Sequence, residues 1–353
     1  MKDTNGLALI NKHRVSLMGI AALLIFVYHE CEVVFGSIPV INFIENFIRR
    51  TGFCGVDIFF LLSGMGLTYS IEKNTLAKFY GKRYKRIVLP FLIAGVIWGI
   101  LCGWSFLDYI KNVTGYNFYV KDVSSFLWFV PAIATLYLFF PLYYKCFLRS
   151  GNKLLFTIGT IGLWLFLSMS VDGVMREDLY GFTNRIPIFV FGVYWGDLSK
   201  AESVKIGRSG WFAVAMTFAV GLVLSFQTNV FDMFLLVPLS NCCVPNFLMA
   251  TSGTLIAVAI LEGLSKVRFV GKAVTKFLSF FGIVSLEFYS VQEFVGIILK
   301  ALFPKLGHWI LNLWVLSVSL ILAYAIYGMV KLIFLLFGKL FFSSERKEKK
   351  SIG

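Results

Sequence analysis

The chain has 353 residues, of which 58% are hydrophobic and only 15% charged, with a mean hydropathy of +0.80 and a net charge of +14. Soluble globular domains carry about 25% charged residues. The composition therefore excludes that class and indicates an integral membrane protein.

Apolar runs of roughly 20 residues, enough to cross about 30 Å of hydrocarbon, recur along the chain. The run near 185–198 is short. Pro238 and Pro245 leave the boundary at the start of the run near 243–262 undefined. The pattern predicts an all-α polytopic membrane protein with a bundle of about ten transmembrane helices. The runs lie near 16–35, 53–71, 87–107, 125–147, 154–171, 185–198, 210–227, 243–262, 277–299 and 309–330.

Residues 1–15 are polar, and no small-residue cleavage site follows the first run, so we expect no cleavable signal peptide. We predict a cytoplasmic N-terminus over 1–15, a transmembrane domain over 16–335 and a basic cytoplasmic tail over 336–353. With this topology the inner loops hold roughly three times as many Lys and Arg as the outer ones. The charge is therefore mostly a topology signal and does not indicate nucleic-acid binding. We expect a multi-pass protein of the inner (plasma) membrane, with the lipid bilayer as its partner. Its oligomeric state is left open.

Six cysteines are scattered through the apolar runs, and none form a CxxC pair. We interpret them as small core residues and expect no metal site.

An ionisable pair stands inside the first run, where "RVSLMGIAALLIFVYHE" ends on His29 and Glu30. Charged groups in hydrocarbon cost about 2.5–3.5 kcal/mol each, so they usually serve function. Glu32 is at i+3 from His29, so the two are expected to share a helix face. Asp57 lies about one turn inside the second run, at a similar depth. An acid that holds one imidazole nitrogen leaves the other free as a base. The alternative is a structural histidine bonded to a backbone carbonyl.

The second run also carries small residues that let helices approach closely, which we interpret as packing positions. They are Gly52, Gly55, Ser63, Gly64 and Gly66.

At the start of the third run, "FYGKRYKRIVLPF" places Arg83 and Arg86 at i and i+3. This pair fits either anionic lipid headgroups or a phosphate-rich ligand, because guanidinium groups bind phosphate in a forked geometry.

Six segments in this order resemble the blocks of the acyltransferase-3 family, which comprises ten-helix bacterial membrane proteins that acylate cell-envelope glycans. They are "GIAALLIFVYH", "GVDIFFLLSG", "FYGKRYKRIVLPF", "SSFLWFVPAIATLYLFFPL", "RIPIFVFGVYWG" and "SLEFYSVQ". The resemblance runs from about residue 12 to 335. It implies that His29 is the catalytic histidine and that Arg83 and Arg86 handle the coenzyme A donor. It also implies that Asp57 and Arg185 are the acid and the arginine of two further family blocks.

The chain departs from the family pattern at two positions. Met18 stands where family members commonly carry an arginine, and Arg14 lies one helical turn earlier, within reach of the same region. Gln292 stands where a late histidine is common, and it cannot carry protons near neutral pH. His29 is then the remaining imidazole base. We assign Arg185, Glu293 and Gln292 to contacts with the acceptor.

We therefore predict a membrane O-acyltransferase that moves an acyl group, most simply acetyl, from cytoplasmic acetyl-CoA to a hydroxyl of an envelope carbohydrate. In this prediction His29 is the general base, and Asp57, Glu30 or Glu32 orients it. Arg83, Arg86 and Arg14 bind the donor.

A transporter or flippase for a glycan, with the acids as a proton relay, is a second hypothesis. A catalytically silent sensor is a third. Incorporation of labelled acetyl into envelope material separates the first hypothesis from both others.

Overall fold

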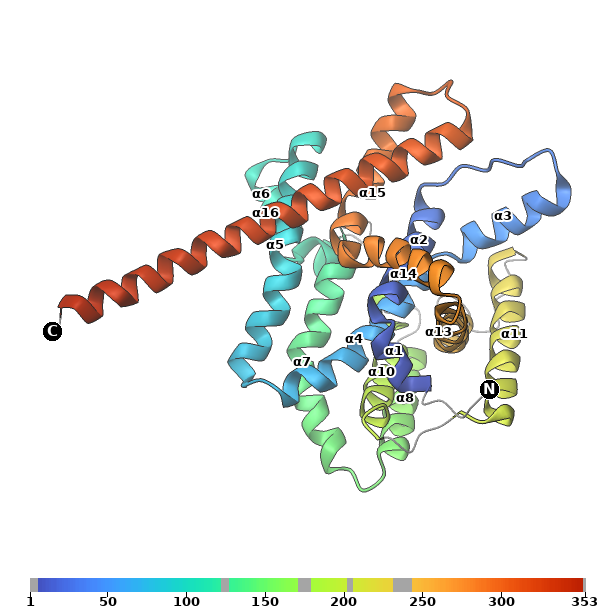
Figure 1. The fold of residues 1–353 in the computed structure, drawn as a ribbon, viewed down its shortest axis with the longest axis horizontal. Helices are drawn as coiled ribbons and strands as arrows, with labels where there is room; N and C mark the ends of the chain where they lie inside the picture. The colour runs from blue at the N-terminus through green and yellow to red at the C-terminus, as the bar shows by residue number, and fades with distance from the viewer. Residues whose placement is uncertain (1–5, 122–126, 171–178, 202–205, 231–242, 352–353) are drawn as a thin grey trace.

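The computed structural model describes residues 6–121, 127–170, 179–201, 206–230 and 243–351. Every element in these ranges is helical, and no strand occurs among them (Figure 1). The all-α prediction is confirmed. Pro238, one of the two prolines noted before and within the run near 243–262, lies outside the described residues.

Within the described ranges, seven helices are long and apolar enough to cross a membrane alone. They are α4 (Cys54–Glu72), α5 (Leu76–Cys102), α7 (Phe129–Arg149), α8 (Lys153–Ser170), α11 (Arg208–Val230), α13 (Val244–Ser265) and α16 (His308–Ser351). Two bent pairs qualify jointly: α1 (Gly6–Lys12) with α2 (Arg14–His29), and α14 (Arg268–Ile283) with α15 (Ser285–Leu302). The described residues thus contain seven to nine candidate spans, where the sequence indicated about ten. The difference includes α10 (Ile186–Leu198), whose 13 residues cover only about 20 Å.

The second bend shows that the predicted run 277–299 is not a single straight helix, whereas the first bend lies just before the predicted run 16–35. The chain turns by 78° between α1 and α2 and by 74° between α14 and α15. At the first bend, the buried His13 places Nε2 3.0 Å from Glu262 Oε2 of α13. A polar contact across the bundle therefore fixes this break.

The end of α2 also differs from the prediction. The helix stops at His29 and Glu30 is its C-cap, so Glu32 does not share a helix face with His29. The backbone of Glu32 bonds instead to the side chain of Asn312 in α16. Its N–H donates to Asn312 Oδ1 at 2.8 Å, and its carbonyl accepts from Asn312 Nδ2 at 2.9 Å.

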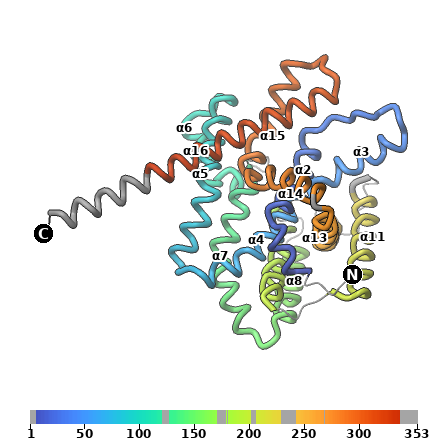
Figure 2. The backbone as a smooth tube through the Cα atoms, in the orientation of Figure 1, coloured from blue at the N-terminus to red at the C-terminus, as the bar shows by residue number. Residues whose placement is uncertain are grey.

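Short helices in the connections were not predicted. They are α3 (Pro39–Thr51), α6 (Phe106–Val113), η1 (Asn117–Lys121) and α9 (Tyr180–Thr183). Pro39 sits in the first turn of α3, where a missing N–H costs nothing. Phe43 and Phe47 of α3 pack on Phe226 of α11, with ring centroids 5.2 and 5.3 Å apart. Figure 1 and Figure 2 both show α3 beside the end of α11.

Small residues bring the central helices into backbone contact. A Cβ on Gly64 of α4 would overlap the carbonyl oxygen of Phe189 in α10, and a Cβ on Gly192 of α10 would overlap that of Leu61. Gly55 fits against Ala21 of α2 in the same way. The packing role predicted for Gly55 and Gly64 is confirmed, and it is the geometry that small residues permit in membranes.

The contact of α2 with α14 depends on Gly19 and Gly282, because a Cβ on either would overlap a backbone carbonyl oxygen of the other helix. We expect Gly282→Ala to lower the free energy of unfolding by about 1–3 kcal/mol, as overpacking does. The thermal midpoint in detergent measures this loss. Gly159→Ala in α8, where a new Cβ meets nothing within 4 Å, is the matched control. Equal midpoints for the two variants would contradict the close packing.

Candidate functional site

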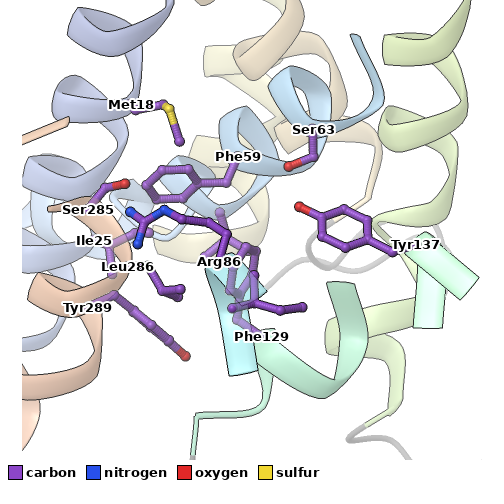
Figure 3. Close-up of a pocket in the computed structure, with 12 residues that line it drawn as sticks. Met18, Ile25, Phe59, Ser63, Arg86, Phe129, Tyr137, Ser285, Leu286 and Tyr289 are labelled. Atoms are coloured by element: carbon purple, nitrogen blue, oxygen red, sulfur yellow. The ribbon is translucent and has the colours of Figure 1, made fainter. Parts of the chain in front are cut away.

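A cavity lies between α2, α4, α5, α7 and α15, and the empty space in and around it, part of which is open solvent, amounts to about 570 Å³ (Figure 3). Its lining is mostly apolar and aromatic, with one guanidinium and a few hydroxyl groups. The lining residues are Met18, Ile25, Val56, Phe59, Ser63, Arg86, Ile87, Phe129, Tyr137, Ser285, Leu286 and Tyr289. Apolar cavities with few polar groups are typical ligand sites.

One face of α2 connects this cavity with two of the predicted site residues. Met18 and Ile25 line the cavity, and at 3.6 residues per turn Arg14 and His29 lie on the same face of the helix. Arg14 is one turn from Met18 in one direction, and His29 is one turn from Ile25 in the other. Arg14 and His29 are thus about 22 Å apart along the axis, with the cavity between their levels.

The Arg14 end of the cavity holds two guanidinium groups that share one glycine. Arg83 Nη2 donates to Gly66 O at 3.2 Å, and Arg14 Nη2 lies 2.6 Å from the place that a Cβ on Gly66 would take. Tyr137 lies near both groups. Gly66, predicted as a helix-packing residue, instead leaves room for an arginine side chain.

These two guanidinium groups lack an acid. In the described part of the chain, no carboxylate pairs with Arg14 or Arg83. Arg14 Nη1 and Arg83 Nε are buried there without a hydrogen-bond partner. Two adjacent cations with unused donors are a suitable site for an anion such as phosphate.

Arg86, the second arginine of the predicted pair, has a different partner. Both its terminal nitrogens bind the carboxylate of Glu287 in α15, with Nη2 to Oε2 at 3.2 Å, and Nη2 also donates to Ile283 O at 3.3 Å. Figure 3 shows its guanidinium directed toward Met18 and Ser285. Glu287 is fully buried, so this bidentate pair neutralises a charge inside the bundle. The structure thus brings Arg14 to Arg83 and takes Arg86 away from that pair.

Asp57 forms a separate buried cluster. Its Oδ2 lies 3.5 Å from Arg185 Nε and accepts from Asn246 Nδ2 at 3.2 Å, while Arg185 stacks 5.2 Å from the Trp128 ring. The exposed fractions of Asp57 and Arg185 are 1% and 3%. No hydrogen bond between Asp57 and His29 occurs among the described residues. The predicted pairing with His29 is therefore corrected: the aspartate lies against Arg185, the predicted acceptor contact.

His29 lies one helical turn beyond the cavity-lining Ile25, at the exposed end of α2. The imidazole is exposed and packs edge-on against the ring of Tyr28, with centroids 4.8 Å apart. Glu30 points away toward α15, where Lys300 Nζ lies 3.7 Å from its Oε2. On the same face of α15, Gln292 and Glu293 follow Tyr289 by about one turn, so they continue the cavity wall toward His29. Gln292 is buried, and its Oε1 has no partner within the described ranges.

Sequence reasoning missed Glu287 and Tyr137, which meet the arginines of the site. "SLEFYSVQ" carries the one signal for Glu287, an acid in an apolar segment. In the described part of the chain, no three His, Cys, Asp or Glu side chains lie close enough together to hold a metal ion.

A comparison with known protein families identifies the domain of this chain. The model described as an acyltransferase domain, that of the acyltransferase-3 family, matches residues 17–332. The chain therefore belongs to the acyltransferase-3 family, and this membership implies acyltransferase activity. With its apolar helices, it is a multi-pass membrane protein. Searches of curated proteins and of solved structures find no significant match.

Proposed function

We propose that this protein transfers an acyl group, most simply acetyl, from acyl-CoA to a hydroxyl of a cell-envelope carbohydrate. The alignment of Arg14, the cavity and His29 along one face of α2 carries this proposal. A donor with phosphates at one end and a thioester at the other matches a site with cations at one end and an imidazole at the other. With the N-terminus in the cytoplasm of an inner-membrane protein, the Arg14 end faces the donor pool.

In this proposal the phosphates of the donor bind Arg14 and Arg83, and the pantetheine arm lies in the apolar cavity. Arg86 serves as a wall of the cavity, because its charge is taken by Glu287. Arg14 then compensates for Met18, which occupies the position of the usual family arginine.

The chemistry is a direct transfer with His29 as the general base. The acceptor hydroxyl approaches from the exposed side of His29. It gives its proton to a nitrogen of His29 as the hydroxyl oxygen attacks the thioester carbonyl. The new acyl–oxygen bond forms, the acyl–sulfur bond breaks, and the imidazolium returns the proton to the leaving thiolate. Gln292 and Glu293 provide polar groups for the acceptor next to His29.

The proposal is tested with the protein in liposomes, acyl-labelled acetyl-CoA and an envelope fraction of the host. We expect label in the carbohydrate as an ester that mild alkali releases. Glycan movement across the bilayer without labelling would support the flippase hypothesis. Neither labelling nor movement would support the silent sensor.

The donor end gives a second test. We expect Arg14→Gln and Arg83→Gln each to raise the KM for acetyl-CoA roughly 10-fold or more, because a charged hydrogen bond contributes about 1.5–3 kcal/mol. Arg83→Lys should restore little, since an ammonium group cannot reproduce the guanidinium fork. Lys85→Gln, which removes an exposed cation two residues away, is the control. An unchanged KM in both arginine variants would move the donor site elsewhere.

A further inference from the structure

The residue that follows His29 is held in a notch of α15. Glu30 is 3% exposed, and a Cβ on Gly296 would overlap its Oε2. Only glycine at position 296 leaves room for this carboxylate. Burying a carboxylate costs free energy unless a partner compensates its charge. The burial of Glu30 therefore calls for such a partner.

Lys300 supplies the opposite charge, one turn beyond Gly296 on the same face of α15. Its Nζ lies 3.7 Å from Glu30 Oε2 and 3.1 Å from Glu32 Oε1. Glu293, one turn before Gly296, adds negative charge near Glu30. The ammonium group of Lys300 therefore lies within 4 Å of two carboxylates, and a third carboxylate lies nearby.

Asn312 of α16 fixes the same segment through the backbone. It binds both the N–H and the carbonyl of Glu32, at 2.8 and 2.9 Å. By contrast, no hydrogen bond or ion pair of the His29 side chain occurs among the described residues, and its ring packs against that of Tyr28. The imidazole is thus placed by the anchored residues that follow it and not by a partner of its own.

We propose that Gly296, Lys300 and Glu30 are positioning residues that set His29 at the mouth of the cavity by fastening the end of α2 to α15. This inference rests on the proposed function of His29 as the base. Glu30, predicted as a catalytic acid, acts here through the placement of its neighbour. A displacement of about 1 Å at a reacting group can cost roughly 100-fold in rate.

The test compares Gly296→Ala with wild type in the acyl-transfer assay. We expect kcat to fall 10-fold or more and the KM for acetyl-CoA to stay unchanged, because Arg14 and Arg83 lie at the other end of the cavity. Gly162→Ala in α8, where a new Cβ meets nothing within 4 Å, is the matched control. Lys300→Gln removes the charge that pairs with Glu30 and introduces no clash. If Gly296→Ala fails to fold, the same comparison of kcat and KM in Lys300→Gln tests the positioning role.

A double mutant shows whether the notch acts through Glu30. If it does, Glu30→Ala and Glu30→Ala/Gly296→Ala should have the same kcat, since the clash disappears with the side chain. Additive losses would assign Gly296 to helix packing alone and overturn the proposal.

Hydrogen exchange gives a readout that needs no activity. We expect the backbone amides of residues 30–36 to exchange faster in Gly296→Ala and in Lys300→Gln than in wild type. Unchanged exchange together with unchanged kcat in an active protein would overturn the positioning role and leave the proposed function standing. If His29→Ala kept its activity, the proposed role of His29 as the base would fail, and the exchange rates would still test the anchor.

Discussion

Replacing His29 with Ala should reduce acyl transfer by about 100- to 10,000-fold, the usual contribution of a general base. The variant should reach the membrane in normal amount, because the imidazole is exposed and packs edge-on against the ring of Tyr28. The measurement is the initial rate of labelled acetyl incorporation at saturating acetyl-CoA, with protein matched by immunoblot.

The control for this result is His308→Ala, which removes another exposed imidazole at the start of α16. We expect His308→Ala to keep normal activity. A His29→Ala protein with more than a tenth of the wild-type rate would exclude His29 as the base. Retained binding of coenzyme A in an inactive His29→Ala protein would confine the defect to the chemical step.

Asp57→Asn should be the most destabilising single change among the site residues. It keeps the size of the side chain and removes its charge, which leaves the guanidinium of Arg185 buried without a counter-charge. Breaking a buried pair in this way costs about 3–5 kcal/mol. We expect a clear fall in the thermal midpoint in detergent, and a loss of activity that follows the loss of folded protein.

Two further variants isolate the cause. Asp197→Asn breaks the more exposed pair with Lys153, and it should cost about 1 kcal/mol or less. Asp57→Asn/Arg185→Gln removes both buried charges, and it should melt above Asp57→Asn alone. If the double mutant melts no higher, the pair does not account for the loss.

The pH profile of the surviving activity distinguishes the structure from the sequence-based expectation. An aspartate bonded to His29 would, when replaced, shift the apparent pKa of the base. Because Asp57 lies against Arg185 and Asn246, we expect the profile of Asp57→Asn to keep the wild-type shape. A shifted profile would restore the pairing of Asp57 with His29.

Much of the fold is determined locally. Apolar runs in lipid must satisfy their backbone groups within the segment, so they form helices, and their lengths predicted most of the spans. The bends at His13 and Val284 and the end of α2 at His29 were not predicted. They depend on groups from other helices, such as Glu262 and Asn312.

The sequence by itself determined an all-helical membrane protein of the acyltransferase-3 family, with ionisable residues placed within apolar segments. Only the tertiary structure decided which charges meet. Arg86 and Glu287 are 201 residues apart in the chain, and the distance between two charges sets their energy, which no spacing along one helix reveals. Arg14 and Arg83 remain without an acid for the same reason, because the folded bundle brings no carboxylate of the described residues to them. The proposed donor site is thus defined by two cations, Arg14 and Arg83, that no carboxylate of the described residues pairs with.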